Sequence, residues 1–410
     1  MKKVELLAPA GNLEKLKMAV IYGADAVYFA GQRFGLRAGA GNFSTGEIEE
    51  GVKFAHSHGS KAYLTVNIIP HNEHLKGLDE YIKDISELGV DALIVSDLGV
   101  FSIIRDILPG MEVHISTQAN NVNYASAAFW HRLGAKRIIL ARELSLQEIK
   151  EIRASTPDSL DLEVFVHGAM CISYSGRCLL SNYMANRDSN LGDCAHPCRW
   201  KYHLVEEKRP GQYYPVFEDE SGTFIFNSKD LCMIEHLPEL IDSGVTSLKI
   251  EGRMKSAYYV ATVVKAYRDA LDTYYADPEE YRRSAAKWLD EVCKASHREF
   301  TTGFFFSKPG AEGQIYDRST YVRDYDFVGL VLDYDPASGI ATIEQRNRMF
   351  TGDIVEVVGP GRDYFVQSIE AMRNDEGEPI DVAPHPQQVV TMPMKHPVKP
   401  FDMLRKPQEE

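Results

Sequence analysis

The sequence lacks long hydrophobic runs, since no stretch of its 410 residues approaches the roughly 20 apolar residues that a membrane-spanning helix needs. Two lysines stand near the start, but Glu5 and the turn formed by Pro9, Ala10 and Gly11 interrupt the apolar segment too early for a signal peptide. These absences predict a cytoplasmic protein whose thiols stay reduced. With 44% hydrophobic and 25% charged residues, the composition is that of a globular protein.

The sequence is also poor in positive charge. It contains 45 Lys and Arg residues against 59 Asp and Glu residues, which gives a formal net charge of −14. A protein that coats nucleic acid is basic, because its affinity comes largely from neutralising phosphates. The composition therefore excludes indiscriminate nucleic-acid binding and is compatible only with a local basic patch.

Cysteine is scarce and unevenly distributed. The chain has six cysteines, four of which lie between Val164 and Trp200. They are Cys171, Cys178, Cys194, Cys198, Cys232 and Cys293. A reducing compartment argues against a disulfide knot, so a zinc site, a catalytic nucleophile and an iron–sulfur cluster remain. Cys293 lies in a helical pattern, where a free cysteine serves as a small hydrophobic residue.

Eight short apolar segments, rich in Val, Ile, Leu or Tyr, recur in the first 253 residues. They cover residues 4–11, 22–31, 61–67, 88–97, 112–118, 133–143, 162–168 and 243–253. Such runs are typical of parallel strands buried on both faces. Helical patterns lie between them; for example, Leu13, Leu16 and Val20 keep helical spacing between Asn12, a good N-cap, and Gly23. After the eighth segment, the same spacing follows Ser256 at Val260, Val264, Tyr267 and Leu271. The pattern predicts an α/β fold, a (β/α)8 TIM-like barrel, rather than a doubly wound open sheet.

The alternation also suggests how the chain divides. We expect a TIM-like barrel over residues 1–275, with a cysteine-bearing insertion at 168–246 after the seventh strand. Residues 276–320 are charged and rich in Tyr and Phe, which indicates a helical connector. From residue 321 to residue 410, apolar and polar residues alternate between turn signals, which predicts a small C-terminal antiparallel β-barrel.

Polar residues stand where the predicted strands end. They are Asn67, Asp97, Gln118, Arg142, Glu143, His167, Glu251 and Arg253. Because the C-terminal ends of the strands build the active site of a (β/α)8 barrel, these side chains should converge on one mouth. Any one of them is more simply a hydrogen-bonded rim residue, but eight together predict a site. His167 is also the only base candidate beside the cysteine-rich segment.

The cysteine spacing favours a cluster over the other possibilities. Six residues separate Cys171 from Cys178, three separate Cys194 from Cys198, and 33 separate Cys198 from Cys232. Zinc sites usually pair C-x2-C knuckles, which neither pair forms. Iron–sulfur clusters accept more varied spacing. No G-x-S-x-G elbow or H-E-x-x-H motif supports a hydrolase, so we expect a metal or cluster.

The insertion is basic within an acidic chain. Six basic and four acidic residues lie between Cys171 and Arg209, and aromatic residues are interleaved with them. Arg177, Arg199 and Lys201 could hold a phosphate while an aromatic ring stacks on a base. Equally, these cations could offset the charge of the thiolates. The residues alone leave both interpretations open.

The segment EVFVHGAMCISYSGRCLLS, residues 163–181, resembles the signature of peptidase family U32, the collagenase-like family. The matching positions are Glu163, Phe165, Gly168, Cys171, Gly176, Cys178 and Ser181. Residues 5–31, 181–200, 227–241 and 247–270 resemble other conserved blocks of the same family. The resemblance extends over nearly the whole chain, including the C-terminal part.

The full-length match is most similar to the tRNA-hydroxylating members of that family. This resemblance implies oxygen-independent formation of 5-hydroxyuridine at the tRNA wobble position, with a prephenate-derived small molecule taking part. Other members act on another RNA base or on a quinone precursor, and hydroxylation of either is the second alternative function for this chain. The older family label, collagenase-like peptidase, stays as the alternative function.

The resemblance also implies a 4Fe-4S cluster, with zinc as the alternative metal and the iron–sulfur assembly machinery as a partner besides tRNA. Its ligands would be Cys171, Cys178, Cys194 and Cys232, with Cys198 as an alternate. We predict catalytic roles, in proton handling or contact with a small donor, for His167, Glu251 and Arg253. We predict substrate binding by Asn67, Gln118, Glu143, Arg177, Arg199 and Lys201.

Overall fold

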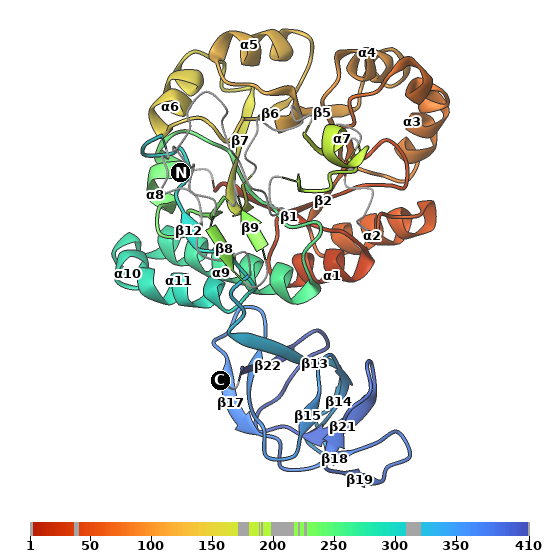
Figure 1. Cartoon of the computed structure of the whole chain (residues 1–410), viewed down its shortest axis with the longest axis vertical. Coiled ribbons are helices and arrows are strands. Elements are labelled where there is room, and N and C mark those ends of the chain that lie inside the picture. The colour runs from red at the N-terminus through yellow and green to blue at the C-terminus, as the bar shows by residue number, and fades with distance from the viewer. Residues whose placement is uncertain are drawn as a thin grey trace.

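The computed structural model describes residues 3–36, 41–170, 180–187, 189, 192–197, 217–219, 222–224, 228–308 and 321–408. Its larger part is a closed barrel of eight parallel strands, in which the last strand pairs with the first (Figure 1). The barrel strands are β1 (Glu5–Pro9), β2 (Ala26–Phe29), β3 (Lys61–Val66), β4 (Ala92–Val95), β5 (Glu112–Ile115), β6 (Arg137–Ile139), β7 (Asp161–Ala169) and β11 (Ser247–Ile250). Each coincides with one of the eight apolar segments of the sequence, β7 extending one residue beyond its segment at each end, so the predicted fold class is confirmed.

Helices surround the barrel. They are α1 (Leu13–Ile21), α2 (Thr45–Ser57), α3 (Leu78–Ser86), α4 (Leu98–Ile107), α5 (Tyr124–Arg132), α6 (Leu146–Ala154), α8 (Leu237–Asp242) and α9 (Ala257–Ala276), with short 3-10 turns η1 (Asn72–Leu75) and η2 (Thr117–Ala119). The Asn12 side chain caps α1 by accepting from the Lys15 amide, and Gly23 follows the helix with φ of +105°. The Ser256 side chain caps α9 in the same way. Both helix starts agree with the sequence signals.

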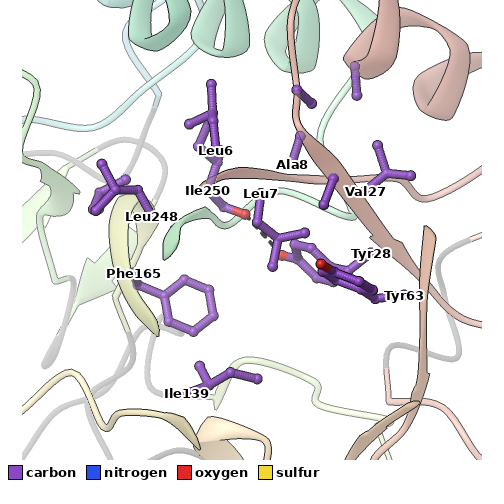
Figure 2. Close-up of a cluster of buried hydrophobic side chains, with 14 of the residues drawn as sticks. Leu6, Leu7, Ala8, Val27, Tyr28, Tyr63, Ile139, Phe165, Leu248 and Ile250 are labelled. Carbon is purple, nitrogen blue, oxygen red and sulfur yellow. Dashed lines mark hydrogen bonds between the residues drawn. The ribbon is translucent and has the colours of Figure 1, made fainter. Parts of the chain in front are cut away.

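The interior of the barrel is filled by alternate side chains of the strands. Figure 2 shows Leu7, Tyr28, Tyr63, Ile139 and Phe165 projecting toward one another from five different strands. The Tyr28 hydroxyl donates a hydrogen bond to the Ile250 carbonyl at 3.1 Å and so ties β2 to β11. Because strands buried on both faces need no polar side, the near-continuous apolar runs in the sequence are explained.

The sheet is extended beside β7 by the chain that returns from the insertion. Strand β10 (Asp230–Cys232) pairs antiparallel with the end of β7, and β12 (Phe300–Thr301) pairs with β10. The other described elements of the insertion are α7 (Leu180–Ala185), β8 (Phe217–Asp219) and β9 (Gly222–Phe224). The β7–β10 pairing sets Cys232 opposite His167. The two ends of the insertion therefore lie side by side at the barrel mouth.

A bulge in β7 changes the direction of its last side chains. Glu163 and Phe165 pair with Ser247 and Lys249 of β11, but the register then shifts so that His167 pairs with Ile250. Simple alternation would point His167 into the barrel with Phe165. Instead its ring packs against Tyr259 and Tyr267 of α9, outside the barrel.

The C-terminal part follows α10 (Pro278–Arg283) and α11 (Ala285–Cys293). It is an antiparallel sheet that curves into a half barrel with the strand order β17-β16-β22-β13-β14-β21-β18-β19, accompanied by the pair β15 and β20. The bounds are β13 (Tyr325–Asp335), β14 (Ile340–Gln345), β15 (Met349–Phe350), β16 (Ile354–Val358), β17 (Phe365–Ser368), β18 (Met372–Arg373), β19 (Pro379–Ile380), β20 (Val382–Ala383), β21 (Val389–Pro393) and β22 (Met403–Pro407). Its own core contains Val328, Ile343 and Val390.

This sheet lies against the barrel helices (Figure 1). Buried polar contacts join the two parts. The fully buried Arg405 donates to both carboxylate oxygens of Glu291, at 2.7 and 3.0 Å, and to Glu356 at 2.8 Å. The hydroxyl of Tyr22, which caps the C-terminal end of α1, donates to the Phe401 carbonyl at 2.9 Å and lies 3.1 Å from the Val358 carbonyl. Within the described ranges, no helix combines the length and apolarity that crossing a membrane requires.

Candidate functional site

The C-terminal ends of β3, β4 and β5 are joined by hydrogen bonds around Asn67. Its side-chain oxygen accepts from the Leu36 amide at 3.2 Å, and its side-chain nitrogen donates to the Ser116 hydroxyl at 3.4 Å. Its carbonyl accepts from the Ser96 hydroxyl at 3.0 Å. The sequence correctly placed Asn67 on the rim, where it organises three strand ends. Asp97, another predicted rim residue, caps α4 by accepting from the Gly99 and Val100 amides.

Arg253 connects the opposite side of the mouth. It is only 4% exposed, and its guanidinium donates to the Thr65 hydroxyl of β3 at 3.3 Å. The backbone beneath it is packed so closely that a Cβ on Gly11 would lie 2.1 Å from the Arg253 carbonyl oxygen. The loops after β1 and β11 are therefore held together, and Arg253 reaches from the end of β11 to the end of β3.

Glu251 lies beside the end of β7. Its amide donates to the His167 carbonyl at 2.8 Å, and its carbonyl accepts from the Tyr259 hydroxyl at 3.3 Å. Gly168 has φ of +112°, and a Cβ there would lie 2.7 Å from the Glu251 carbonyl oxygen. Only glycine fits this close approach. Glu251, Arg253 and the exit of β7 thus form one side of the mouth.

Residues after β5 and β6 form another side, rich in buried polar atoms without partners. Among the described residues, these atoms are Gln118 Oε1, Asn120 Oδ1, Asn121 Nδ2, Arg142 Nε and Glu143 Oε2. Burial raises the pKa of the Glu143 carboxyl, although Arg142 and nearby amides oppose the shift. Gln118 and Glu143 were predicted from the sequence, whereas Asn120 and Asn121 were missed. The signal that could have found them is the polar run QANN after the fifth strand.

His167 lies outside the barrel bore, close to Cys232. Its Nδ1 is 3.4 Å from the Tyr267 hydroxyl, which donates to the Val166 carbonyl at 2.8 Å and accepts from the Met233 amide at 3.2 Å. Burial lowers the pKa of His167 to about 3, helped by the nearby charge of Lys255, so the imidazole is neutral at pH 7. Its predicted catalytic role stays a prediction, because the ring lies among packed aromatic side chains next to the mouth rather than within it.

Cys232 is a buried thiol in the same cluster. Burial raises its pKa to about 12, while hydrogen bonding with the Ile234 amide and the Tyr267 hydroxyl acts in the opposite direction. A backbone amide next to a buried sulfur suits a thiolate that is neutralised by metal, because ligating thiolates are commonly hydrogen-bonded. The Cys232 surroundings therefore fit a metal or cluster ligand. Cys194 is half-buried, and its sulfur accepts from the His196 amide at 3.4 Å.

Several predicted positions lie outside the described residues. They are Cys171, Cys178, Cys198, Arg177, Arg199 and Lys201. Within the described ranges, no three His, Cys, Asp or Glu side chains come together to hold a metal ion. The ligand set from the sequence therefore stays a prediction, with Cys194 and Cys232 the two members whose positions are known.

A network of charged side chains lies inside the barrel, toward the N-terminal ends of its strands. The sequence did not predict this network. Glu163 is fully buried and accepts from Lys249 Nζ at 2.8 Å and from Arg137 Nη1 at 2.9 Å. Arg137 also binds Glu5, whose carboxylate accepts from the Tyr63 hydroxyl at 2.7 Å. Burial opposes ionisation of Glu163, but Lys249 and Arg137 lower its pKa to about 2. These charges neutralise one another beneath the apolar layer of Phe165 and Tyr28.

Comparison with known proteins gives consistent matches over the full chain. Residues 11–315 match the family model described as Peptidase family U32, and residues 323–405 match that of the Peptidase family U32 C-terminal domain. A tRNA hydroxylation protein P1 of Bacillus subtilis (strain 168) is 45% identical over 99% of this chain and 95% of that protein. A tRNA hydroxylation protein P of Escherichia coli (strain K12) is 39% identical over 96% and 94%. A collagenase of Porphyromonas gingivalis is 30% identical over 98% and 97%.

Proposed function

Because this chain belongs to peptidase family U32, we propose that it is an enzyme that hydroxylates tRNA. The reaction is the formation of 5-hydroxyuridine at the wobble position without molecular oxygen, in the cytoplasm. Supporting this proposal, relatives that align over almost the entire chain bear the name tRNA hydroxylation protein. The polar mouth of the barrel, crossed by Arg253, offers a place for the reacting base.

A four-iron four-sulfur cluster is the proposed cofactor. Its ligands are Cys171, Cys178, Cys194 and Cys232, with Cys198 as the alternate to Cys194 and zinc as the alternative metal. The observation that carries this proposal is the pairing of β7 with β10, which places Cys232 opposite His167. His167 precedes Cys171 by four residues in the sequence, so Cys232 lies near the point where the cysteine-rich segment begins. When bound, such a cluster supplies one-electron transfer. Loading it requires the iron–sulfur assembly machinery as a partner.

The residues of the mouth have proposed roles in binding and orientation. Glu251 and Arg253 are assigned to proton handling. Arg253 is also assigned to binding a small organic donor derived from prephenate, because a buried guanidinium binds carboxylates strongly. His167, neutral at pH 7, orients the Tyr267 hydroxyl beside the Cys232 ligand. Asn67, Gln118 and Glu143 contact substrate. Each assignment follows from position and chemistry.

The basic insertion is the proposed grip on tRNA, through Arg177, Arg199 and Lys201. From residue 321 to the end, nine basic residues stand against sixteen acidic ones. An acidic C-terminal part repels phosphates, so it is not the main contact surface. Binding should therefore weaken with added salt according to the few phosphates that the insertion neutralises.

The deciding experiment combines anaerobic purification with nucleoside analysis. The wild-type protein should be coloured and contain about four iron and four sulfide per chain, as expected of one 4Fe-4S cluster. Cys232→Ser should lose most of the iron, whereas Cys293→Ser should retain it. Transfer RNA from a strain lacking this gene and other family members should contain no 5-hydroxyuridine. Colourless protein without iron and sulfide would overturn the cofactor, and unchanged 5-hydroxyuridine would overturn the reaction.

The second candidate function is a peptidase, favoured by the full-length similarity to a collagenase. A peptidase should cleave gelatin equally well after iron is removed, and Cys232→Ser should leave that cleavage unchanged. A tRNA hydroxylase should cleave nothing in either form. The same two protein preparations therefore separate the two functions.

A further inference from the structure

Helix α5 presents an apolar face to solvent. Tyr124, Phe129 and Leu133 are 54%, 46% and 42% exposed, and they lie on the side of the helix opposite the buried Ala127 and Trp130. Among the described helices around the barrel, only α5 exposes more than one large apolar side chain. The helix lies on the side of the barrel away from the C-terminal part (Figure 1). The described parts of the chain therefore leave this face open, and such a face marks an interaction site.

The sector of the barrel that contains α5 lacks carboxylates. Residues 113–142 form the longest stretch of the chain without Asp or Glu, although about one residue in seven of the whole chain is acidic. This stretch folds into β5, η2, α5 and β6. Two chains that each carry a net charge of −14 repel each other. Because the repulsion is weakest where acidic residues are absent, two copies can approach each other most closely at this sector.

The composition of the face is that of a protein–protein interface. The cores of such interfaces are enriched in Tyr, Phe and Arg and depleted of Lys, Asp and Glu. Helix α5 carries Tyr124, Phe129 and Arg132 on its exposed side and contains no Lys, Asp or Glu. A nucleic-acid interface is strongly positive, whereas Arg132 is the one Lys or Arg residue of this helix. A protein partner is therefore favoured over RNA.

The same face is complementary to itself. Tyr124 and Arg132 are eight residues apart, or about 12 Å along the helix, and Ala128 lies midway between them. If two α5 helices pack antiparallel about Ala128, Tyr124 of each copy faces Arg132 of the other. A guanidinium next to a tyrosine ring is attractive. The Arg132 guanidinium lies 5.8 Å from the centre of the Phe129 ring, which keeps it on this face.

We propose that this face of α5 is the interface of a homodimer, in which two copies pack with their α5 helices antiparallel about a twofold axis. A twofold contact uses the same surface of both chains, as a self-complementary face requires, and it is the commonest symmetry of assemblies of identical chains. Phe129 and Leu133 supply buried apolar area. The contact between Tyr124 and Arg132 is made twice and sets the orientation of the helices.

Sedimentation equilibrium of the full-length, anaerobically purified protein tests this assembly. The wild type should have twice the chain mass of 46.1 kDa. Phe129→Glu places a carboxylate in the interface from both sides. Because a loss of about tenfold per copy acts twice, the dissociation constant of the dimer should rise about hundredfold. The matched control Ile354→Glu, 64% exposed on β16 of the C-terminal sheet, should leave the dissociation constant unchanged.

A second pair of variants tests the antiparallel orientation. Arg132→Glu should weaken the dimer, because it removes the guanidinium from the Tyr124 ring of the other copy. Adding Tyr124→Arg to the same chain should restore most of the affinity, since opposite charges then face each other across the interface. A spacing of two helical turns is too long for the two substituted side chains to pair within one helix. Restoration therefore requires the antiparallel contact between copies.

Thermal unfolding identifies variants that fail to fold, and Leu133→Glu replaces Phe129→Glu if that variant does. Wild-type protein that stays a single chain at its highest soluble concentration would overturn the proposal. A dimer that both glutamate variants leave intact, or a failure of Tyr124→Arg to restore the Arg132→Glu dimer, would also overturn it. If Phe129→Glu weakens the binding of an anticodon stem–loop RNA without changing the mass, the face binds RNA and the homodimer is wrong. None of these results depends on iron or on 5-hydroxyuridine, so the proposed function is tested separately.

Discussion

Glu163→Gln removes one negative charge from the interior of the barrel while leaving the shape of the side chain nearly unchanged. In the wild-type protein, Glu163 is the carboxylate bound to Lys249 Nζ, and it also binds Arg137. Arg137 retains Glu5 after the substitution. Lys249 is left with the Tyr28 ring, 4.2 Å from its ammonium, and with the charge of Glu5, which also acts on it.

The expected cost is large because Lys249 is only 3% exposed. Removing one partner of a buried ion pair typically costs about 3–5 kcal/mol, since the other charge stays buried without compensation. We therefore expect the free energy of unfolding to fall by about 3 kcal/mol at pH 7. The double variant Glu163→Gln with Lys249→Met should recover most of that loss, because no unpaired ammonium remains.

The same pair gives a signed dependence on pH. Lys249 and Arg137 lower the pKa of Glu163 from its ordinary value of 4.5 to about 2. A carboxyl whose pKa is lower in the folded state stabilises the fold above its unfolded pKa, and this contribution disappears as pH falls through the folded pKa. The stabilisation is about 3 kcal/mol at pH 7 and about 1 kcal/mol at pH 3. The difference between wild type and Glu163→Gln should shrink accordingly.

Urea titrations at both pH values measure these differences. Glu49→Gln is the control, because Glu49 forms an exposed ion pair with Lys53 on α2 and should contribute little. The slope of unfolding free energy against urea should not change, since the fold is the same. A loss below about 1 kcal/mol at pH 7, or a loss that is equal at pH 3 and pH 7, would refute the reasoning.

Two further substitutions test how the parts of the molecule are joined. Arg405→Met should lower the free energy of unfolding by about 3 kcal/mol, because the largely buried Glu291 loses its bidentate partner and keeps Lys294, 3.3 Å away. The control Lys287→Met, which removes an exposed ion pair with Asp363, should lower the free energy of unfolding by less than about 1 kcal/mol in the same urea titration. Equal losses for the two variants would contradict the role of Arg405. Gly168→Ala should lower the midpoint of thermal unfolding, since φ of +112° and the Glu251 carbonyl exclude a Cβ. The control Gly46→Ala, at a position in helix α2 with open space around it, should not lower the midpoint. An unchanged midpoint for Gly168→Ala would show that the backbone at the barrel mouth can shift to accept a Cβ.

Patterns of burial made the barrel predictable from sequence. Its strands are covered on both faces, so each appears as a continuous apolar run that ends in polar residues. Asn12 and Ser256 marked helix starts because capping depends on a single side chain next to the helix. The antiparallel C-terminal sheet was predictable from alternation, since one face of its strands is buried and the other is largely exposed.

The interior network was not predictable because its members are far apart in the sequence. Arg137 and its partner Glu5 are separated by 132 positions, and Lys249 and Glu163 by 86. Each residue stands inside an apolar run, where one charged residue gives no indication of its partner. The bulge that turns His167 out of the barrel was hidden for a related reason: both faces of β7 are buried, so a shift of register leaves the apolar pattern unchanged.

The pairing of β7 with β10 has a consequence for the evolution of the cysteine segment. Ala169 and Asp230 are direct neighbours in the sheet, so the connection of about 60 residues between them has its two ends held together by the pairing of β7 with β10. Doubling the length of such a loop costs only about 0.6 kcal/mol in chain entropy. Homologues can therefore lengthen, shorten or redesign this segment for new substrates while Cys232 keeps its place on the sheet.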